Sequence, residues 1–105
     1  MRINVWLHAP NHAPAVVDTR INTVENVLDD IRQHWNEEPE GSQFFWLTDE
    51  QDNFLASIHR DPKDNERAVT MHANGSVEHH RCEYLFDENG HYEATEVTCL
   101  KYQPN

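Results

Sequence analysis

Residues 68–100 read AVTMHANGSVEHHRCEYLFDENGHYEATEVTCL. Two Asn-Gly pairs, Asn74-Gly75 and Asn89-Gly90, interrupt this stretch. Asn-Gly is among the strongest short signals for a β-hairpin, because a type I′ turn needs two residues with positive φ. The stretch therefore predicts three consecutive antiparallel strands, at 68–73, 77–86 and 91–100.

The turn type also predicts which residues pair. If both Asn-Gly pairs form two-residue loops, Met71 lies opposite Glu78, and Cys82 lies opposite Val97. One face of these strands then belongs to the core, and it carries Val69, Met71, Cys82, Tyr84, Phe86, Val97 and Cys99. The opposite face carries His72, His79, Arg81, Glu83 and Glu96. Its two glutamates face each other and repel, so we expect this face to be solvated or to meet a cationic partner.

Hydrophobic alternation continues upstream of this stretch. Ile3, Val5 and Leu7 alternate with their neighbours, which predicts a half-buried strand at 2–8. Residues 44–47 read FFWL and are apolar at every position, which is typical of a central strand covered on both faces. Residues 54–59 alternate again, and residues 15–20 are a further candidate strand. The segment 61–67, which contains Pro62, is expected to form a loop.

One stretch has the period of a helix instead. Its apolar positions fall at i, i+3, i+4, i+7 and i+11, and they are Val24, Val27, Leu28, Ile31 and Trp35. Asn22 is the expected N-cap, with Glu25 three residues later, and the helix is expected to end near Asn36. The sequence thus predicts a single α+β domain, residues 1–105, in which one amphipathic helix packs on an antiparallel β-meander of five or six strands.

The charge of the chain narrows the possible partners. Nineteen Asp and Glu residues stand against eight Lys and Arg, which gives a formal net charge of −11. Nucleic acids and anionic membranes bind clustered Lys and Arg, and this sequence has no basic run. We therefore expect neither direct nucleic-acid binding nor membrane attachment. An acidic surface suits a basic protein partner.

The cysteine content and the hydropathy bear on the compartment. Two cysteines in 105 residues do not make a disulfide scaffold. No apolar run approaches the ~20 residues that span a bilayer, and the N-terminal alternation is too short for a secretory signal. The expected location is the cytoplasm.

Eight histidines are the most unusual feature of the composition. In the register above, His80, Cys82 and Cys99 share one face, and zinc accepts this ligand set. The close-spaced ligand pairs of structural zinc sites are absent, however, so the prediction is two ordinary buried cysteines, no metal and no cofactor. His72 and His79 are expected to be diagonal neighbours on the outer face, where they bind a transition metal only adventitiously.

No catalytic arrangement stands out. The sequence lacks a G-x-S-x-G elbow, and its three glycines cannot build a phosphate-binding loop. Paired carboxylates fall in loops, where solvation leaves their pKa values little perturbed. The prediction is that the protein is not an enzyme.

Aromatic side chains near carboxylates indicate a protein-binding surface instead. Trp35 and Trp46 are expected in the core, whereas Trp6 and Tyr92 point away from the expected core faces. Exposed aromatic anchors with a charged rim are typical of binding hot spots. The predicted partner-binding residues are Trp6, Asp49, Glu50, Asp52, Asp87, Glu88 and Tyr92.

Part of the chain resembles small immunity proteins of bacterial polymorphic-toxin systems. The similar elements lie between Ile21 and Ile58: the helix at 22–31, the Trp-bearing strand at 44–47 and the strand at 54–58. Unlike larger families of that kind, this chain has no helix after its last strand. The resemblance implies a cytoplasmic protein that neutralises a cognate toxin by covering its active site, often the basic cleft of a nuclease or deaminase.

The leading hypothesis is therefore a non-enzymatic inhibitor of a basic toxin or nuclease. Three alternatives stay open. The first is a nucleic-acid mimic that blocks a defence nuclease, the second is a small zinc protein using His80, Cys82 and Cys99, and the third is an accessory domain without activity of its own. The outer sheet face also leaves a homodimer possible.

Overall fold

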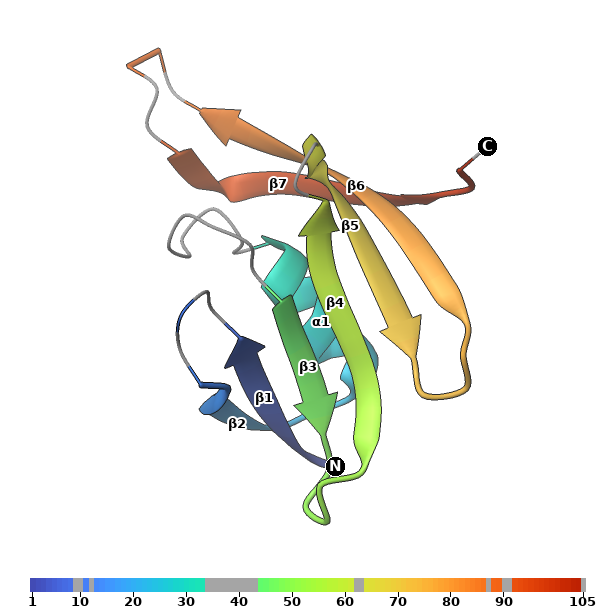
Figure 1. Cartoon of the computed structure of the whole chain (residues 1–105). Helices are drawn as coiled ribbons and strands as arrows, with labels where there is room; N and C mark the ends of the chain where they lie inside the picture. The colour runs from blue at the N-terminus through green and yellow to red at the C-terminus, as the bar shows by residue number, and fades with distance from the viewer. Residues whose placement is uncertain are drawn as a thin grey trace.

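The computed structural model describes residues 1–8, 11, 13–33, 44–61, 64–86, 88–89 and 92–104. These residues form one helix and one sheet (Figure 1). The elements are β1 (Arg2–His8), β2 (Ala15–Ile21), α1 (Val24–Gln33), β3 (Phe44–Thr48), β4 (Phe54–Asp61), β5 (Asp64–His72), β6 (Val77–Phe86) and β7 (Tyr92–Tyr102). The described helix is not long and apolar enough to cross a membrane.

The sheet has seven strands in the order β2-β1-β3-β4-β5-β6-β7, and every neighbouring pair is antiparallel. The prediction of an α+β fold with an antiparallel sheet is confirmed. Strands β3 to β7 form the meander. The helix α1 connects β2 to β3, which lie on either side of β1. The predicted number of five or six strands is wrong.

The uncounted strand is β2, which lies at the edge of the sheet. Six of its seven residues are exposed, so it lacks the alternation by which a half-buried strand is recognised. Backbone pairing with β1 holds it, and an ion pair between Arg20 and Asp30 joins it to α1. The predicted loop at 61–67 is also mostly strand, because β4 extends to Asp61 and β5 begins at Asp64.

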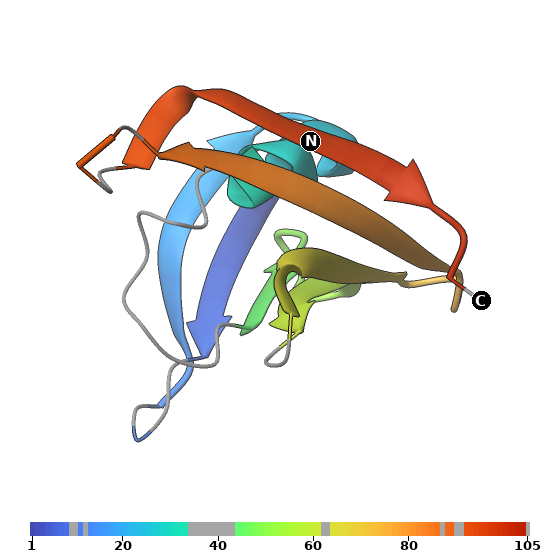
Figure 2. The same ribbon diagram turned by 90° about the horizontal axis from the view of Figure 1, so that it is seen from above.

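The core lies between α1 and one face of the sheet. Figure 2 shows the sheet curving around α1, and the helix contacts both β4 and β7. The buried hydrophobic residues of this layer are Ile3, Val5, Val27, Leu28, Phe45, Leu47, Ala56, Ile58 and Ala68. Full burial of a large aliphatic side chain contributes about 1.5–3 kcal/mol. The helical stripe is confirmed from Val24 to Ile31, and Trp35 lies outside the described residues.

The cap of α1 differs from the prediction by one residue. The Thr23 hydroxyl accepts a hydrogen bond from the Asn26 amide at 3.2 Å, and the Thr23 carbonyl accepts the first helical bond from Val27. Thr23 is therefore the N-cap. Asn22 supports it by accepting hydrogen bonds from the Thr23 amide and the Asn26 side chain. The end of the helix beyond Gln33 lies outside the described residues.

The first Asn-Gly pair forms a hairpin, but the predicted register is wrong by one residue. The His72 amide donates to the Ser76 carbonyl, and the Gly75 amide donates to the His72 carbonyl, both at 2.9 Å. Gly75 has a φ of 88°, whereas Asn74 is not among the positive-φ residues. The loop is thus the three-residue type, with one left-handed glycine. Met71 consequently pairs with Val77, and not with Glu78.

This shift reverses the two faces of β5. Ala68 and Thr70 are fully buried on the side of α1, whereas Met71 is 50% exposed on the other side. A slip of one residue moves every side chain of a strand to the opposite face. Val69 and Met71 are therefore not part of the core. His72 shares the helix-facing side with Ala56, its partner in β4, and so is not a neighbour of His79.

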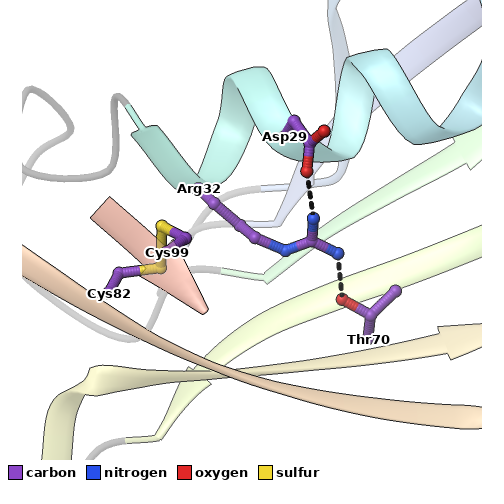
Figure 3. The surroundings of a disulfide bond; sticks show 5 residues. All are labelled: Asp29, Arg32, Thr70, Cys82 and Cys99. Atoms are coloured by element: carbon purple, nitrogen blue, oxygen red, sulfur yellow. Dashed lines mark hydrogen bonds and ion pairs between the residues drawn. A yellow bond between two sulfur atoms is a disulfide. The ribbon is translucent and has the colours of Figure 1, made fainter. Parts of the chain in front are cut away.

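The second hairpin also departs from its predicted register. Cys82 pairs with Cys99 and forms a disulfide with it (Figure 3), where Val97 was the expected partner. An irregularity after Glu83 shifts the pairing, and such bulges are not encoded by the turn residues. Glu83 pairs with Thr98, so the expected opposition of Glu83 and Glu96 is not formed. The side chains of Tyr84, Phe86 and Val97 lie outside the description.

A buried arginine lies beside the disulfide, between α1 and the sheet (Figure 3). The Arg32 side chain is 1% exposed; its guanidinium donates to Asp29 at 2.6 Å and to the Thr70 hydroxyl at 3.1 Å. Burial lowers the pKa of Arg32, and the charge of Asp29 opposes that effect. Arg32 follows Leu28 by four residues, which places both on the core-facing side of α1.

Candidate binding surface

The face of the sheet opposite α1, here called the outer face, carries two rows of side chains that cross the strands. One row consists of Val16, Trp6, Trp46, Ser57, Met71 and Val77, each paired with the next. The other consists of His8, Phe44, His59, Val69, His79 and Tyr102. Figure 1 looks onto this face, with α1 behind the sheet, and no described element lies over it.

Four rings at one end of the outer face form an aromatic cluster. Trp6 and Trp46 stack with ring centroids 5.6 Å apart and planes only 4° from parallel. Phe44 lies 5.8 Å from Trp46 and 6.4 Å from the His59 ring. Aromatic pairs contribute about 0.5–1.5 kcal/mol beyond their burial, so the neighbouring rings hold one another in place.

The outward position of Trp46 corrects the prediction that it belongs to the core. β3 buries Phe45 and Leu47 against α1, so the alternate residues Phe44 and Trp46 face outward. Trp6 faces outward, as predicted. A strand that is apolar on both faces is normally covered on both, and here the second face is covered by no described element.

Apolar atoms remain accessible along the outer face. Phe44 is 37% exposed, Val16 44%, Val77 47% and Met71 50%. Large contiguous apolar surfaces are uncommon on monomers and mark interaction sites. The sequence carried a signal for this surface in the four apolar residues 44–47, which provide an apolar side chain to each face of the strand.

An acidic turn lies at the end of β3, next to the aromatic cluster. The Asp49 carboxylate accepts hydrogen bonds from the amides of Gln51 and Asn53 and from the Asn53 side chain, at 2.9–3.0 Å. The side-chain bond from Asn53 is the main cause that lowers the pKa of Asp49. Asp52 adopts a positive φ of 62°. Asp49 therefore has a structural role within the turn.

One hydrogen bond joins the turn to the cluster. The Trp6 indole Nε1 donates to the Thr48 hydroxyl at 2.9 Å, and Thr48 directly precedes Asp49. Glu50 and Asp52 are exposed, and their carboxylates have no hydrogen bond or ion pair among the described residues. The structure thus places Trp6 beside Thr48, at the start of the turn that carries the other predicted binding residues Asp49, Glu50 and Asp52.

The other predicted binding residues lie elsewhere. Glu88 is exposed in the turn between β6 and β7, at the opposite end of the molecule from the Asp49 turn (Figure 1). Asp87 and the side chain of Tyr92 fall outside the described residues. The two acidic turns therefore do not form one continuous surface.

The far end of the outer face has a different charge. The Arg81 guanidinium lies 5.8 Å from the ring centre of Tyr102, and Arg67 lies 3.3 Å from Nδ1 of His79. Glu66 forms an ion pair with Arg81 at 3.7 Å. The acidic 49–52 turn thus follows the strand that carries Phe44 and Trp46, whereas arginines lie at the β5–β7 end of the same face.

The disulfide also bears on the alternative zinc site. His80 and Cys82 do share one side of β6, and Cys99 lies opposite Cys82. The sulfur atoms of Cys82 and Cys99 are bonded to each other. Zinc binds cysteine as a free thiolate, and a disulfide provides none. In the disulfide form these three residues therefore offer only one zinc ligand, the His80 imidazole.

Comparisons with known proteins give no further assignment, because no family model matches the sequence and no curated protein or solved structure shows significant similarity.

Proposed function

We propose that the protein is a non-enzymatic acidic binding protein that inhibits a basic protein partner. The observation that carries this proposal is the outward-facing Trp6–Trp46 stack beside the exposed carboxylates of the 49–52 turn. The resemblance of residues 21–58 to immunity proteins supports a cognate bacterial toxin as the partner. In this role the protein covers the active site of the toxin and performs no chemistry itself.

The aromatic cluster supplies the affinity in this proposal. Trp is among the residues most enriched at binding hot spots, where truncation to Ala costs about 2 kcal/mol or more. Stacking of Trp6 on Trp46 and the bond from Trp6 to Thr48 fix the rings before binding. A preorganised surface loses less conformational entropy when the complex forms.

The carboxylates supply the steering. The chain carries a formal net charge of −11, so its long-range field attracts a basic protein and raises the association rate. Glu50 and Asp52 are exposed in the turn that follows Thr48, the hydrogen-bond partner of Trp6. Charges at the rim of an interface affect the association rate and its salt dependence more than the dissociation rate.

The experiment that tests the proposal uses the tagged chain as bait in a lysate of the source organism, at low and at high salt. We expect one stoichiometric basic protein that is released as the salt concentration rises and whose purified activity is inhibited by the chain. The Trp46→Ala variant should no longer capture the partner. The Glu88→Lys variant, which is changed at the opposite end of the molecule, should capture it as the wild type does. A chain that captures no partner at either salt concentration contradicts the proposal.

The proposed compartment is the cytoplasm, and the Cys82–Cys99 bond provides its test. Disulfides persist in oxidising compartments and are rare in the reducing cytoplasm. A cytoplasmic protein should therefore contain two free thiols in living cells, which thiol alkylation during lysis followed by mass spectrometry measures. A fully oxidised pair in cells would assign the protein to an oxidising compartment.

A further inference from the structure

Three side chains that bind metals in other proteins converge where the first turn of α1 meets the β5–β6 hairpin. They are Glu25 of α1, His72 at the end of β5 and Glu78 of β6. One ligand atom from each lies within 4.8 Å of the other two. This cluster lies on the helix-facing side of the sheet, separate from the aromatic cluster of the outer face.

The hairpin determines the position of two of these side chains. His72 closes the three-residue loop through two backbone hydrogen bonds. Thr70 pairs with Glu78, so Glu78 lies diagonal to His72 and on the same face. Diagonal neighbours on one face of an antiparallel pair are within reach of long side chains. The shifted register is therefore what brings His72 and Glu78 together.

The contact between these two residues has the geometry of neighbouring metal ligands. His72 Nε2 lies 3.4 Å from Oε1 of Glu78, and this buried nitrogen makes no hydrogen bond with any described residue. Zinc bonds to His nitrogen and carboxylate oxygen are about 2.0–2.2 Å long, so two ligand atoms of a tetrahedral site lie about 3.4 Å apart. The distance between His72 Nε2 and Glu78 Oε1 therefore equals the distance between two ligand atoms of a tetrahedral zinc site. Because His72 Nε2 makes no hydrogen bond with a described residue, it is available to coordinate a metal ion.

We propose that Glu25, His72 and Glu78 bind a divalent transition-metal ion, with zinc as the best fit to this ligand set. Imidazole and carboxylate ligands together suit zinc, and two carboxylates balance the charge of a divalent cation. Glu25 is exposed, and its carboxylate oxygen already lies within 4.8 Å of the ligand atoms of His72 and Glu78. Three protein ligands leave a fourth position for water or for a group from a partner.

Lys101 competes for the same carboxylate. Its ammonium lies 3.5 Å from Oε1 of Glu78, while its side chain is 60% exposed. A bound cation displaces this ammonium into solvent. Removal of the lysine charge should therefore tighten metal binding, which no purely structural role of Lys101 predicts.

Titration of the purified, tag-free full chain with zinc chloride in a calorimeter tests the site. We expect one equivalent of Zn²⁺ per chain, with the affinity reduced at least about 10-fold in His72→Gln and in Glu78→Gln. The matched control is His79→Gln, which removes a histidine from the outer face and should bind zinc as the wild type does. Circular dichroism establishes that each variant is folded.

Lys101→Met provides a test that does not depend on weakening the fold, and it should bind zinc more tightly than the wild type. An ordinary His72–Glu78 ion pair predicts no saturable zinc binding in any variant. The proposal is overturned if the wild type binds no zinc, if His72→Gln and His79→Gln lose affinity equally, or if Lys101→Met leaves the affinity unchanged.

Discussion

Reduction of the Cys82–Cys99 disulfide is expected to destabilise the protein without unfolding it. The bond joins two directly paired residues of β6 and β7, next to the buried Arg32. Cys82 itself is fully buried. Because the bond joins two residues that are also paired in the sheet, we expect its main effect to be a restriction of the unfolded chain.

The sequence separation of the two cysteines determines the size of this effect. The bond closes a loop with a sequence separation of 17 residues. The chain-entropy relation then gives about 3 kcal/mol of stabilisation at 25 °C. A domain of this size has a free energy of unfolding of about 5–15 kcal/mol, so the reduced protein should stay folded, with its melting temperature lowered by roughly 10–20 °C.

Urea denaturation of the oxidised and the reduced protein measures the difference. The matched control is the double variant Cys82→Ala/Cys99→Ala, whose stability should not respond to a reductant. The reasoning is refuted if reduction changes the free energy of unfolding of the wild type by less than about 0.5 kcal/mol. It is also refuted if the reductant destabilises the double variant as much as the wild type.

Three further substitutions test individual parts of the fold. Thr70→Val removes the hydroxyl that accepts a hydrogen bond from Arg32 and should lower the free energy of unfolding by about 1.5–3 kcal/mol, measured with urea; no change would mean that this bond is unimportant. Gly75→Ala places a Cβ at a φ of 88° in open space and should cost about 1–2 kcal/mol from backbone strain alone, whereas a neutral result would argue against the three-residue loop. Asp49 has a lowered pKa in the folded state, mainly because the Asn53 side chain donates to it. Its contribution to stability is therefore present above the unfolded value of about 3.9 and is lost as the pH falls through the folded value. Thermal melts at several pH values should show a stability advantage of the wild type over Asp49→Asn that shrinks in this acid range, and a constant difference would contradict the assignment.

Much of the fold follows from local pattern. The alternation of Ile3, Val5 and Leu7 predicted β1, and the 3.6-residue period predicted the buried face of α1. These signals are strong because each element buries one continuous face. β2 gave only a weak signal, since an edge strand with exposed side chains is held by backbone pairing and not by apolar burial.

Register could not be predicted from the same signals. The sequence Asn74-Gly75 is compatible with both a two-residue and a three-residue hairpin loop. The two loops give registers that differ by one residue, and this difference exchanges the two faces of β5. The bulge after Glu83 is likewise invisible in the sequence, and it is what places Cys99 opposite Cys82.

The candidate binding surface was predicted only in part for the same reason. Trp6 and the 49–52 turn follow from alternation and charge, and the structure brings them together. Trp46 was expected in the core because an apolar strand is normally covered on both faces. The Glu25–His72–Glu78 cluster depends on the hairpin register and on the position of α1, so sequence spacing alone could not reveal it.

The most direct test of the proposed function is the association rate of the captured partner with the purified chain, measured at several salt concentrations. Glu50→Lys should slow association at low salt and reduce its salt dependence, because Glu50 is exposed two residues after Thr48, the hydrogen-bond partner of Trp6. Glu88→Lys, at the opposite end of the molecule, makes the same change in net charge and should have a clearly smaller effect. If Glu50→Lys leaves association unchanged at low salt, or if Glu88→Lys has the larger effect, then the Trp6–Trp46 end of the outer face is not the surface that binds the partner.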